Sequence, residues 1–292
     1  MGNTEMRRLG RKVVANGVTL NVVDEGDGLP VLLLHGFPDS SHLWRHQIPA
    51  LTGAGYRVIA PDQRGFGLSD RPQDAKSYGH ELLMADAIAV LDDAGVDRAA
   101  LVTHDWGAAI GWLLAERHPE RFTCHAALSV GPLAAYHGCR DIRQREKSWY
   151  TLFFQYAGVA EKSLKADDWR LFREWTRHHP EVDHWIADLS REGALTAALN
   201  WYRANVFSMP VGERAGIRVP TLGLWSDQDA YLIEEQMSTA GRYVDADWRY
   251  ERIQGASHWM MLDCPQHIDR LLLGFLRRYP APAVPRGEVA TR

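Results

Sequence analysis

Cysteine is scarce in this 292-residue chain, where Cys124, Cys139 and Cys264 have a spacing unlike that of a metal site. A chain with so few cysteines does not depend on disulfides, and we expect a reduced, cytoplasmic protein. Long apolar runs are missing as well. Residues 1–8 lack the apolar stretch of a secretory signal, and no run in the sequence reaches the length of a membrane span. We therefore expect neither secretion nor a membrane partner.

Runs of one charge sign are absent too. Lys and Arg number 33 against 37 Asp and Glu, which gives a formal net charge of −4. The densest basic stretch, residues 140–147, mixes both signs, as is typical of a solvated loop or helix face. Nucleic acid is therefore not expected as a partner. What the chain has in quantity is apolar residues, 46% of the total, which suffice for a large buried core.

Short apolar segments recur along the chain and are separated by turn residues and helices. Residues 13–23 form two β-like runs around Asn16-Gly17, a dipeptide typical of tight hairpin turns. Further strands are predicted at residues 31–34, 56–60, 99–103, 126–130, 218–225 and 248–253, and helices at residues 81–94 and 108–117. In the first helix the expected apolar face comprises Leu82, Ala85, Ile88, Ala89 and either Leu91 or Asp92. Because buried strands alternate with helices, the sequence predicts an α/β fold with a mostly parallel, twisted sheet flanked by helices.

Residues 133–215 interrupt this pattern. They are rich in Trp, Arg, Glu and Ala at helical spacing and contain no convincing strand. We therefore predict a discontinuous core domain, residues 1–132 and 216–292, into which a helical cap domain, residues 133–215, is inserted. The tail from Pro280 onwards is rich in proline and is expected to be disordered.

The segment Thr103-His104-Asp105-Trp106-Gly107 connects a predicted strand to a predicted helix. A sharp turn here exposes one side chain at the carboxyl edge of the sheet and needs small residues after it, which Gly107 and Ala108 provide. Asp105 occupies the apex, where a carboxylate near a helix N-terminus is stabilised as an anion and can act as a nucleophile. Asp is also a common N-cap, and this segment alone does not separate the two interpretations.

Two later segments supply the partners that such a nucleophile needs. A hydrolase triad on a sheet of this kind runs nucleophile, acid, histidine along the chain. Asp227 and Asp229 follow one predicted strand and His258 follows the next, each near the carboxyl end, where ligands bind in open α/β sheets. We prefer Asp229 as the acid, because the loop needs a few residues to fold back toward His258. Asp227 then becomes a turn residue.

The segment His35-Gly36-Phe37-Pro38 follows another predicted strand. The backbone N–H of Phe37, in a turn stiffened by Pro38, and that of Trp106 would together form an oxyanion hole. A plain turn that only ends the strand is compatible with the same residues.

Together these segments resemble the α/β-hydrolase-fold epoxide hydrolases over nearly the whole chain. The resemblance is carried by four segments: His35–Pro38, Asp62–Asp70, His104–Gly107 and Gly255–Trp259. Haloalkane dehalogenases share much of this set, so the segments identify a branch of the superfamily and not one reaction. Phe37 argues against haloalkane dehalogenases, which often have Asn at this position.

The inserted segment distinguishes the two reactions. Epoxide hydrolases of this type have two cap tyrosines that hydrogen-bond the epoxide oxygen, and the resemblance places them at Tyr150, in the segment 150–155, and at Tyr202, in Trp201-Tyr202-Arg203. A phenol can donate a hydrogen bond or a proton to the poor alkoxide leaving group. Without the resemblance, either tyrosine would be taken as structural.

The resemblance implies an enzyme that converts a small apolar epoxide and water to a vicinal diol. Asp105 would attack a ring carbon, and His258, oriented by Asp229, would activate water to hydrolyse the resulting ester. No metal or organic cofactor is implied, and the oligomeric state stays open, a homodimer included. Two alternatives remain: carbon–halogen hydrolysis by the same Asp105, and a ligand-binding protein of the same fold without catalytic activity.

Overall fold

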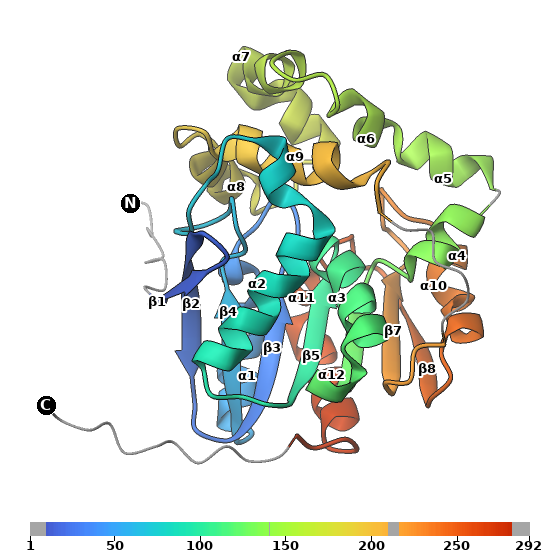
Figure 1. Cartoon of the computed structure of the whole chain (residues 1–292). Coiled ribbons are helices and arrows are strands. Elements are labelled where there is room, and N and C mark those ends of the chain that lie inside the picture. Colours follow the sequence, from blue (N-terminus) through green and yellow to red (C-terminus); the bar gives the residue numbers. More distant parts are fainter. Residues whose placement is uncertain (1–9, 140, 210–215, 282–292) are drawn as a thin grey trace, which may run out of the picture.

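The computed structural model describes residues 10–139, 141–209 and 216–281. Its centre is an eight-stranded sheet with the order β1-β2-β4-β3-β5-β6-β7-β8 (Figure 1). The strands are β1 Arg11–Ala15, β2 Val18–Glu25, β3 Leu29–Leu34, β4 Tyr56–Pro61, β5 Ala99–His104, β6 Phe122–Leu128, β7 Thr221–Ser226 and β8 Trp248–Ile253. The pairs β1–β2 and β2–β4 are antiparallel and the other pairs are parallel. The predicted α/β fold with a mostly parallel sheet is confirmed.

Helices cover both faces of this sheet. In Figure 1, α2 and α3 lie on one face, and α1 and α12 lie on the other. The helices are α1 Gln47–Gly53, α2 His80–Asp93, α3 Trp106–Arg117, α4 Leu133–Gly138, α5 Ile142–Lys147, α6 Trp149–Phe153, α7 Val159–Trp175, α8 Val182–Leu189, α9 Ala194–Asn205, α10 Glu235–Ser238, α11 Met260–Asp263 and α12 Pro265–Leu276. Short 3₁₀ helices lie at Ser41–Trp44, Ala75–Tyr78, Pro119–Arg121 and Ala240–Tyr243.

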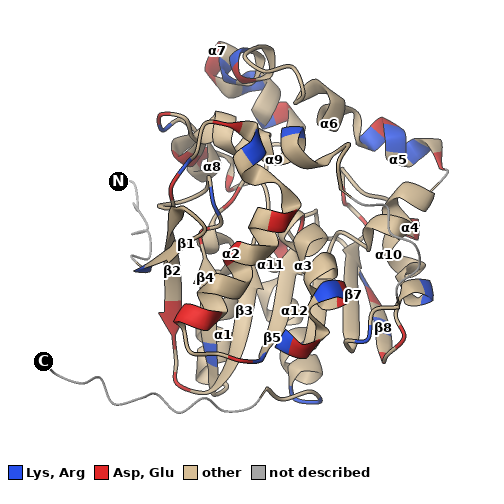
Figure 2. Cartoon of the chain, in the orientation of Figure 1, with Lys and Arg blue, Asp and Glu red and all other residues tan. Residues whose placement is uncertain are grey.

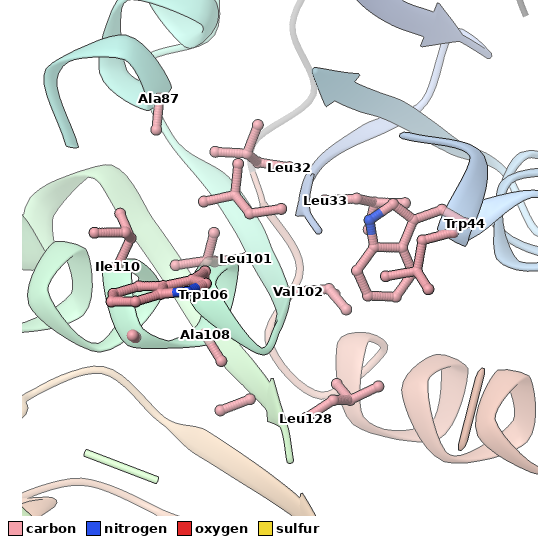
Figure 3. Close-up of a cluster of buried hydrophobic side chains, with 14 of the residues drawn as sticks. Leu32, Leu33, Trp44, Ala87, Leu101, Val102, Trp106, Ala108, Ile110 and Leu128 are labelled. Atoms are coloured by element: carbon pink, nitrogen blue, oxygen red, sulfur yellow. The ribbon is translucent and has the colours of Figure 1, made fainter. Parts of the chain in front are cut away.

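The central strands are buried on both faces, which explains their continuous apolar sequences. In β5, Leu101 lies on the side of Ile110 from α3, whereas the next residue, Val102, lies on the side of Trp44 (Figure 3). All four side chains are buried. The strand alternation therefore anchors helices to both sides of the sheet at its centre.

The apolar face of α2 differs from the expected one. Leu82, expected on it, is 37% exposed, and the buried side chains of this helix include Leu83, Ala87 and Val90. Apolar residues occur on almost every side of α2, so the 3.6-residue periodicity does not determine which side packs on the sheet. The packing against β1 and α3 decides it.

Among the described residues between β6 and β7 there are six helices, α4 to α9, which form what we call the helical insert. The insert lies beyond one end of the sheet (Figure 1). Trp106, which follows β5, has its ring centroid 5.0 Å from that of Tyr202 in α9, so this is the end where the parallel strands have their carboxyl termini. The exact boundaries of the two domains, 132/133 and 215/216, stay a prediction.

Parts of three expectations lie outside the described residues. They concern Arg140 in the mixed-charge stretch, residues 210–215 at the end of the insert, and the tail, of which only Pro280 and Ala281 are described. Within the described ranges, none of the helices combines the length and the apolar character that crossing a membrane would require.

Candidate active site

Asp105 stands on a strained turn between β5 and α3. Its φ of 52° and ψ of −120° are unusual for a residue other than glycine. The turn is possible because two neighbouring residues, Gly36 and Gly107, have no side chain. A Cβ on Gly36 would lie 2.3 Å from Asp105 Oδ1, and a Cβ on Gly107 would lie 2.3 Å from the carbonyl oxygen of Leu34. Glycine is therefore required at both positions to present the carboxylate of Asp105.

Two backbone amides hold this carboxylate. The N–H of Phe37 donates to Asp105 Oδ1 at 2.8 Å, and the N–H of Trp106 also hydrogen-bonds the carboxylate. The buried ring of His35 supports the turn that carries Phe37, since its Nδ1 donates to the Gly36 carbonyl at 3.1 Å and its Nε2 accepts the Gln63 N–H at 2.9 Å. The structure thus places both amides predicted for the oxyanion hole at the predicted nucleophile.

Asp229, and not Asp227, lies beside His258. Its Oδ2 accepts a hydrogen bond from His258 Nδ1 at 2.8 Å, and its Oδ1 accepts from the backbone amides of Tyr231 and Leu232 at 2.7 and 2.9 Å. Asp227 instead accepts from the backbone amide of Gly255 at 2.8 Å. The two amides on Oδ1 fix the Asp229 carboxylate so that its other oxygen faces the imidazole.

His258 lies between two carboxylates. Its Nδ1 faces Asp229, and its Nε2 lies 3.5 Å from Asp105 Oδ2. Burial lowers the pKa of His258, but the charges and hydrogen bonds of Asp229 and Asp105 more than offset this and raise the pKa to about 10. Burial in turn raises the pKa of Asp105, and the hydrogen bond and charge of His258 bring it below its ordinary value. At neutral pH the site therefore holds a protonated imidazole beside the ionised carboxylate of Asp105.

The backbone carbonyl of His258 is held by two side chains that the sequence did not point to. His104 Nε2 donates to it at 3.0 Å, and Ser129 Oγ donates at 3.1 Å. Burial lowers the pKa of His104 to about 3, so this imidazole is neutral. Ser129 has a φ of 71°, and the side-chain amide of Gln236 donates to its carbonyl at 2.8 Å. His104 adjoins Asp105 in the sequence, but nothing there links it to His258.

Tyr150 of α6 and Tyr202 of α9 lie together over Asp105. Their ring centroids are 5.9 Å apart, and both side chains line the same pocket as the Asp105 carboxylate. Burial, with the negative charge of Asp105 in addition, raises the pKa of each phenol well above its usual range. Both tyrosines are therefore protonated at neutral pH and can donate hydrogen bonds into the pocket.

Two further aromatic residues lie beside the site: Tyr231, which the sequence did not indicate, and Trp175, one of the aromatic residues of the insert that suggest an apolar pocket. The ring of Tyr231 lies 5.0 Å from that of His258 and 5.7 Å from that of Tyr150. The ring of Trp175, at the end of α7, lies 5.2 Å from that of Tyr150. Tyr231 comes two residues after Asp229, a proximity that could have indicated it. No sequence signal separates Trp175 from the other aromatic residues of the insert.

This arrangement combines the carboxylate of Asp105, a histidine–carboxylate pair and two phenols. A carboxylate can displace a leaving group from carbon, phenols can protonate an oxygen that leaves, and a histidine can activate water against the resulting ester. The site thus has the parts of a hydrolase that works through an aspartyl ester.

Comparison with known proteins agrees with this class. A family model described as the alpha/beta hydrolase fold matches residues 30–265. The chain therefore belongs to the α/β-hydrolase fold family. Within that family its relatives carry a more specific name. It is 36% identical to epoxide hydrolase A of Mycobacterium tuberculosis, over 91% of this chain and 96% of that protein, and 33% identical to epoxide hydrolase 3 of Xenopus tropicalis, over 90% and 76%. The chain belongs to the epoxide hydrolases.

Solved structures give the same result. The crystal structure of epoxide hydrolase A from Mycobacterium thermoresistibile matches with a TM-score of 0.76 at 32% identity, over 91% of this chain and 97% of that one. A Bacillus megaterium epoxide hydrolase in complex with an inhibitor matches with a TM-score of 0.82 at 27% identity, over 91% and 100%.

Proposed function

We propose that this protein is an epoxide hydrolase that converts an epoxide to a vicinal diol through a covalent ester on Asp105. The observation that carries the proposal is the shared pocket of Asp105, Tyr150 and Tyr202. An epoxide whose oxygen accepts hydrogen bonds from both phenols presents its ring carbons toward the carboxylate. Membership of the epoxide hydrolase family supports the same reaction.

In the first step Asp105 opens the ring. The Phe37 amide holds Oδ1, which leaves Oδ2 as the attacking oxygen. The bond from Oδ2 to a ring carbon forms while the carbon–oxygen bond of the epoxide breaks, and a phenol of Tyr150 or Tyr202 gives its proton to the departing oxygen. His258, which is protonated at rest, returns a proton to that phenolate. The products are a neutral ester and a neutral imidazole.

In the second step water hydrolyses the ester. Ester formation removes the negative charge of Asp105, one of the two carboxylates that raise the pKa of His258. The neutral imidazole takes a proton from water, and the water oxygen attacks the ester carbonyl carbon. The amides of Phe37 and Trp106 stabilise the oxyanion that forms. Collapse breaks the bond between the former ester carbon and the alkoxide oxygen, and the alkoxide takes the proton of the hydroxyl that water left on this carbon. The products are the diol, ionised Asp105 and protonated His258.

The pocket gives less support to carbon–halogen hydrolysis. A halide leaving group would need indole N–H donors, and Trp106 is the one tryptophan among the described residues that line the pocket. The indole of Trp201 donates to the Arg64 carbonyl at 3.0 Å, and that of Trp185 donates to Asp39 at 2.9 Å. Both donors are thus engaged elsewhere, whereas the phenols of Tyr150 and Tyr202 match an oxygen leaving group.

The test offers styrene oxide and 1-bromobutane to the same purified protein. We expect formation of phenylethanediol, measured by chromatography, and no bromide release above that of Asp105→Ala. Bromide release without diol would contradict the proposal in favour of dehalogenation. Binding of the epoxide with no turnover would leave a non-catalytic protein of this fold.

A second test removes the two phenol groups. The double variant Tyr150→Phe, Tyr202→Phe should lose at least about 100-fold in kcat/KM for styrene oxide, because general acid assistance is lost. The control is Tyr156→Phe, since Tyr156 also belongs to the insert but is 65% exposed. Full activity of the double variant would show that the phenols do not assist ring opening.

A further inference from the structure

The pocket beside Asp105 extends to one side of the nucleophile. It has a volume of about 110 Å³ and lies between α3, α4, α6 and α9. Beyond Asp105, Tyr150 and Tyr202, its lining includes Leu133 of α4 and Val206 and Met209, which follow α9. A substituent on the epoxide can therefore extend from Asp105 toward α4 and the end of α9.

Most polar side chains in this lining are already paired within the protein. The Tyr136 hydroxyl shares a hydrogen bond of 2.9 Å with Ser148 Oγ, and Thr151 Oγ1 donates to the Ser148 carbonyl at 2.8 Å. The side-chain amide of Asn205 donates to the Tyr78 carbonyl at 2.8 Å. Beyond the reacting groups and the exposed His137, the lining thus offers apolar surface, and the substituent that it accepts is apolar.

A cluster of aromatic rings that do not line this pocket packs beside the site. The ring of Phe37 lies 5.8 Å from that of Phe154 and 5.5 Å from that of Trp175. Trp175 also lies 5.2 Å from Tyr150 and 5.9 Å from Phe172. Phe37, Phe154 and Phe172 are buried. We call Phe37, Phe154, Phe172 and Trp175 the aromatic wall.

A second cavity, of about 500 Å³, lies behind this wall and is bordered by Trp175 and Tyr231. Their rings are 4.7 Å apart, and the Tyr231 hydroxyl donates to the Trp175 carbonyl at 2.8 Å. Tyr231 in turn contacts His258. One layer of side chains therefore separates this cavity from the reacting groups. On its outer side the cavity is lined by residues of α5 that include Arg143 and Lys147, and the ribbon of this helix has the blue of Lys and Arg in Figure 2.

We propose that Trp175 determines the substrate class by closing the second side of the site, so that the enzyme prefers epoxides with apolar substituents on one ring carbon only. The proposal rests on the proposed function. When the phenols of Tyr150 and Tyr202 hold the oxygen and one substituent fills the pocket, a trans substituent on the other carbon points away from the pocket. It meets the aromatic wall, whose Trp175 blocks the space behind it.

Trp175 is also the part of the wall that can be removed with the least disturbance. Its indole N–H is buried and has no hydrogen-bond partner among the described residues, so truncation leaves no donor or acceptor unpaired. It borders a cavity, whereas Phe154 and Phe172 are fully enclosed. Shortening Trp175 should therefore join the second cavity to the active site.

The test compares styrene oxide with trans-stilbene oxide, which carries the same phenyl group on both ring carbons. We expect wild-type kcat/KM to be at least about 100-fold higher for styrene oxide, as for other substrates that a closed pocket excludes. Trp175→Ala should raise the relative kcat/KM for trans-stilbene oxide at least about tenfold. Trp175→Leu, which keeps more apolar volume, should give a smaller change in the same direction.

The matched control is Trp149→Ala. Trp149 lines the same second cavity, but it is 47% exposed and lies on the solvent side. It should leave the ratio for the two substrates unchanged. Equal wild-type kcat/KM for both substrates, or an unchanged ratio in folded Trp175→Ala and Trp175→Leu, would overturn the role of Trp175 and leave the proposed function intact. Turnover of neither epoxide would instead contradict the proposed function.

Discussion

His258 changes its acid–base behaviour during the proposed reaction because one of its two carboxylate partners is the nucleophile. Burial alone would lower the pKa of this imidazole, and the charges of Asp229 and Asp105 raise it to about 10. When the ester forms, the Asp105 charge is gone, and Asp229 alone offsets the lowering of the His258 pKa by burial. The same residue is thus a protonated group during ring opening and a base during hydrolysis.

The effect of the Asp229 charge on the pKa of His258 should therefore be measurable in the pH dependence of ester formation. In wild-type enzyme the rate of ester formation should fall as the pH rises through about 10, where His258 loses its proton. Asp229→Asn removes one charge that raises this pKa, so the alkaline fall should move to lower pH. Single-turnover tryptophan fluorescence, with Trp106 beside the nucleophile, measures this rate.

The matched control for that experiment is Asp227→Asn. It makes the same chemical change on the same loop, but Asp227 bonds the Gly255 amide and does not touch His258. In this variant the alkaline fall in the rate of ester formation should occur at the same pH as in the wild type. An alkaline fall at the same pH in Asp229→Asn and wild type would show that Asp229 does not control the charge of His258.

Ser129 acts as a positioning residue for His258. Its hydroxyl donates to the His258 carbonyl at 3.1 Å, and its backbone is in the left-handed region. Ser129→Ala loses the hydroxyl and keeps the strain, whereas Ser129→Gly loses the hydroxyl and relieves the strain. Both should slow ester hydrolysis about tenfold, the value of one hydrogen bond, so that ester accumulates in quenched-flow samples.

The stability of the two variants distinguishes a positioning role of Ser129 from a structural role. Ser129→Gly should be at least as stable as Ser129→Ala in urea, because glycine adopts a positive φ without strain. If ester accumulated only in the less stable variant, the hydroxyl would have a folding role and no part in placing the imidazole.

The sequence located the residues that follow strands and missed those that act through tertiary contacts. Asp105, Asp229 and His258 were found because each stands after a predicted strand. Ser129 was missed, and Trp175 was not distinguished from the other aromatic residues of the insert. Ser129 donates a hydrogen bond to a backbone carbonyl that lies 129 positions away in the chain. Trp175 packs against aromatic rings from other segments. Neither contact leaves a local pattern.

At the scale of elements, the turn from β5 to α3 depends on close backbone approach. Gly107→Ala places a Cβ 2.3 Å from the Leu34 carbonyl oxygen, and backbone cannot move aside cheaply. We expect a loss of about 1–3 kcal/mol in the free energy of unfolding, as for other overpacked sites. Urea denaturation followed by circular dichroism measures it.

Gly274→Ala is the matched control within α12. No atom lies within 4 Å of the added Cβ there. This substitution in a helix should stabilise the protein by about 0.5–1 kcal/mol, because alanine loses less backbone entropy than glycine. A Gly107→Ala variant as stable as wild type would mean that the turn is less crowded than described.

Element boundaries were predictable where the apolar pattern is simple and not where polar residues are buried. The strand expected at residues 126–130 is β6, Phe122–Leu128, and its first half includes Thr123 and His125. His125 is buried because its Nε2 shares a 2.8 Å hydrogen bond with Thr103 Oγ1 on the neighbouring strand, and burial lowers its pKa to about 3. A polar strand residue paired across the sheet has no apolar signature in its own sequence.

At the scale of the whole molecule, the helical insert and the sheet share one continuous hydrophobic core. Polar contacts add to it. Trp185 Nε1 in α8 donates to Asp39 at 2.9 Å, and Arg45 pairs with Glu181 at 2.6 Å. The insert therefore holds Tyr150 and Tyr202 at fixed positions over Asp105. Its helical content was predictable from the sequence, but the face that docks on the sheet was not, since aromatic residues occur all along it.

The central claim is that Asp105 becomes covalently bound to the substrate, and a single turnover in ¹⁸O-labelled water tests it most directly. With enzyme in excess over styrene oxide, the new oxygen of the first diol comes from the Asp105 carboxylate. We expect unlabelled diol in this turnover and ¹⁸O in the peptide that contains Asp105. Labelled diol from the first turnover, with no label in that peptide, would show that water attacks the epoxide directly and would contradict the account.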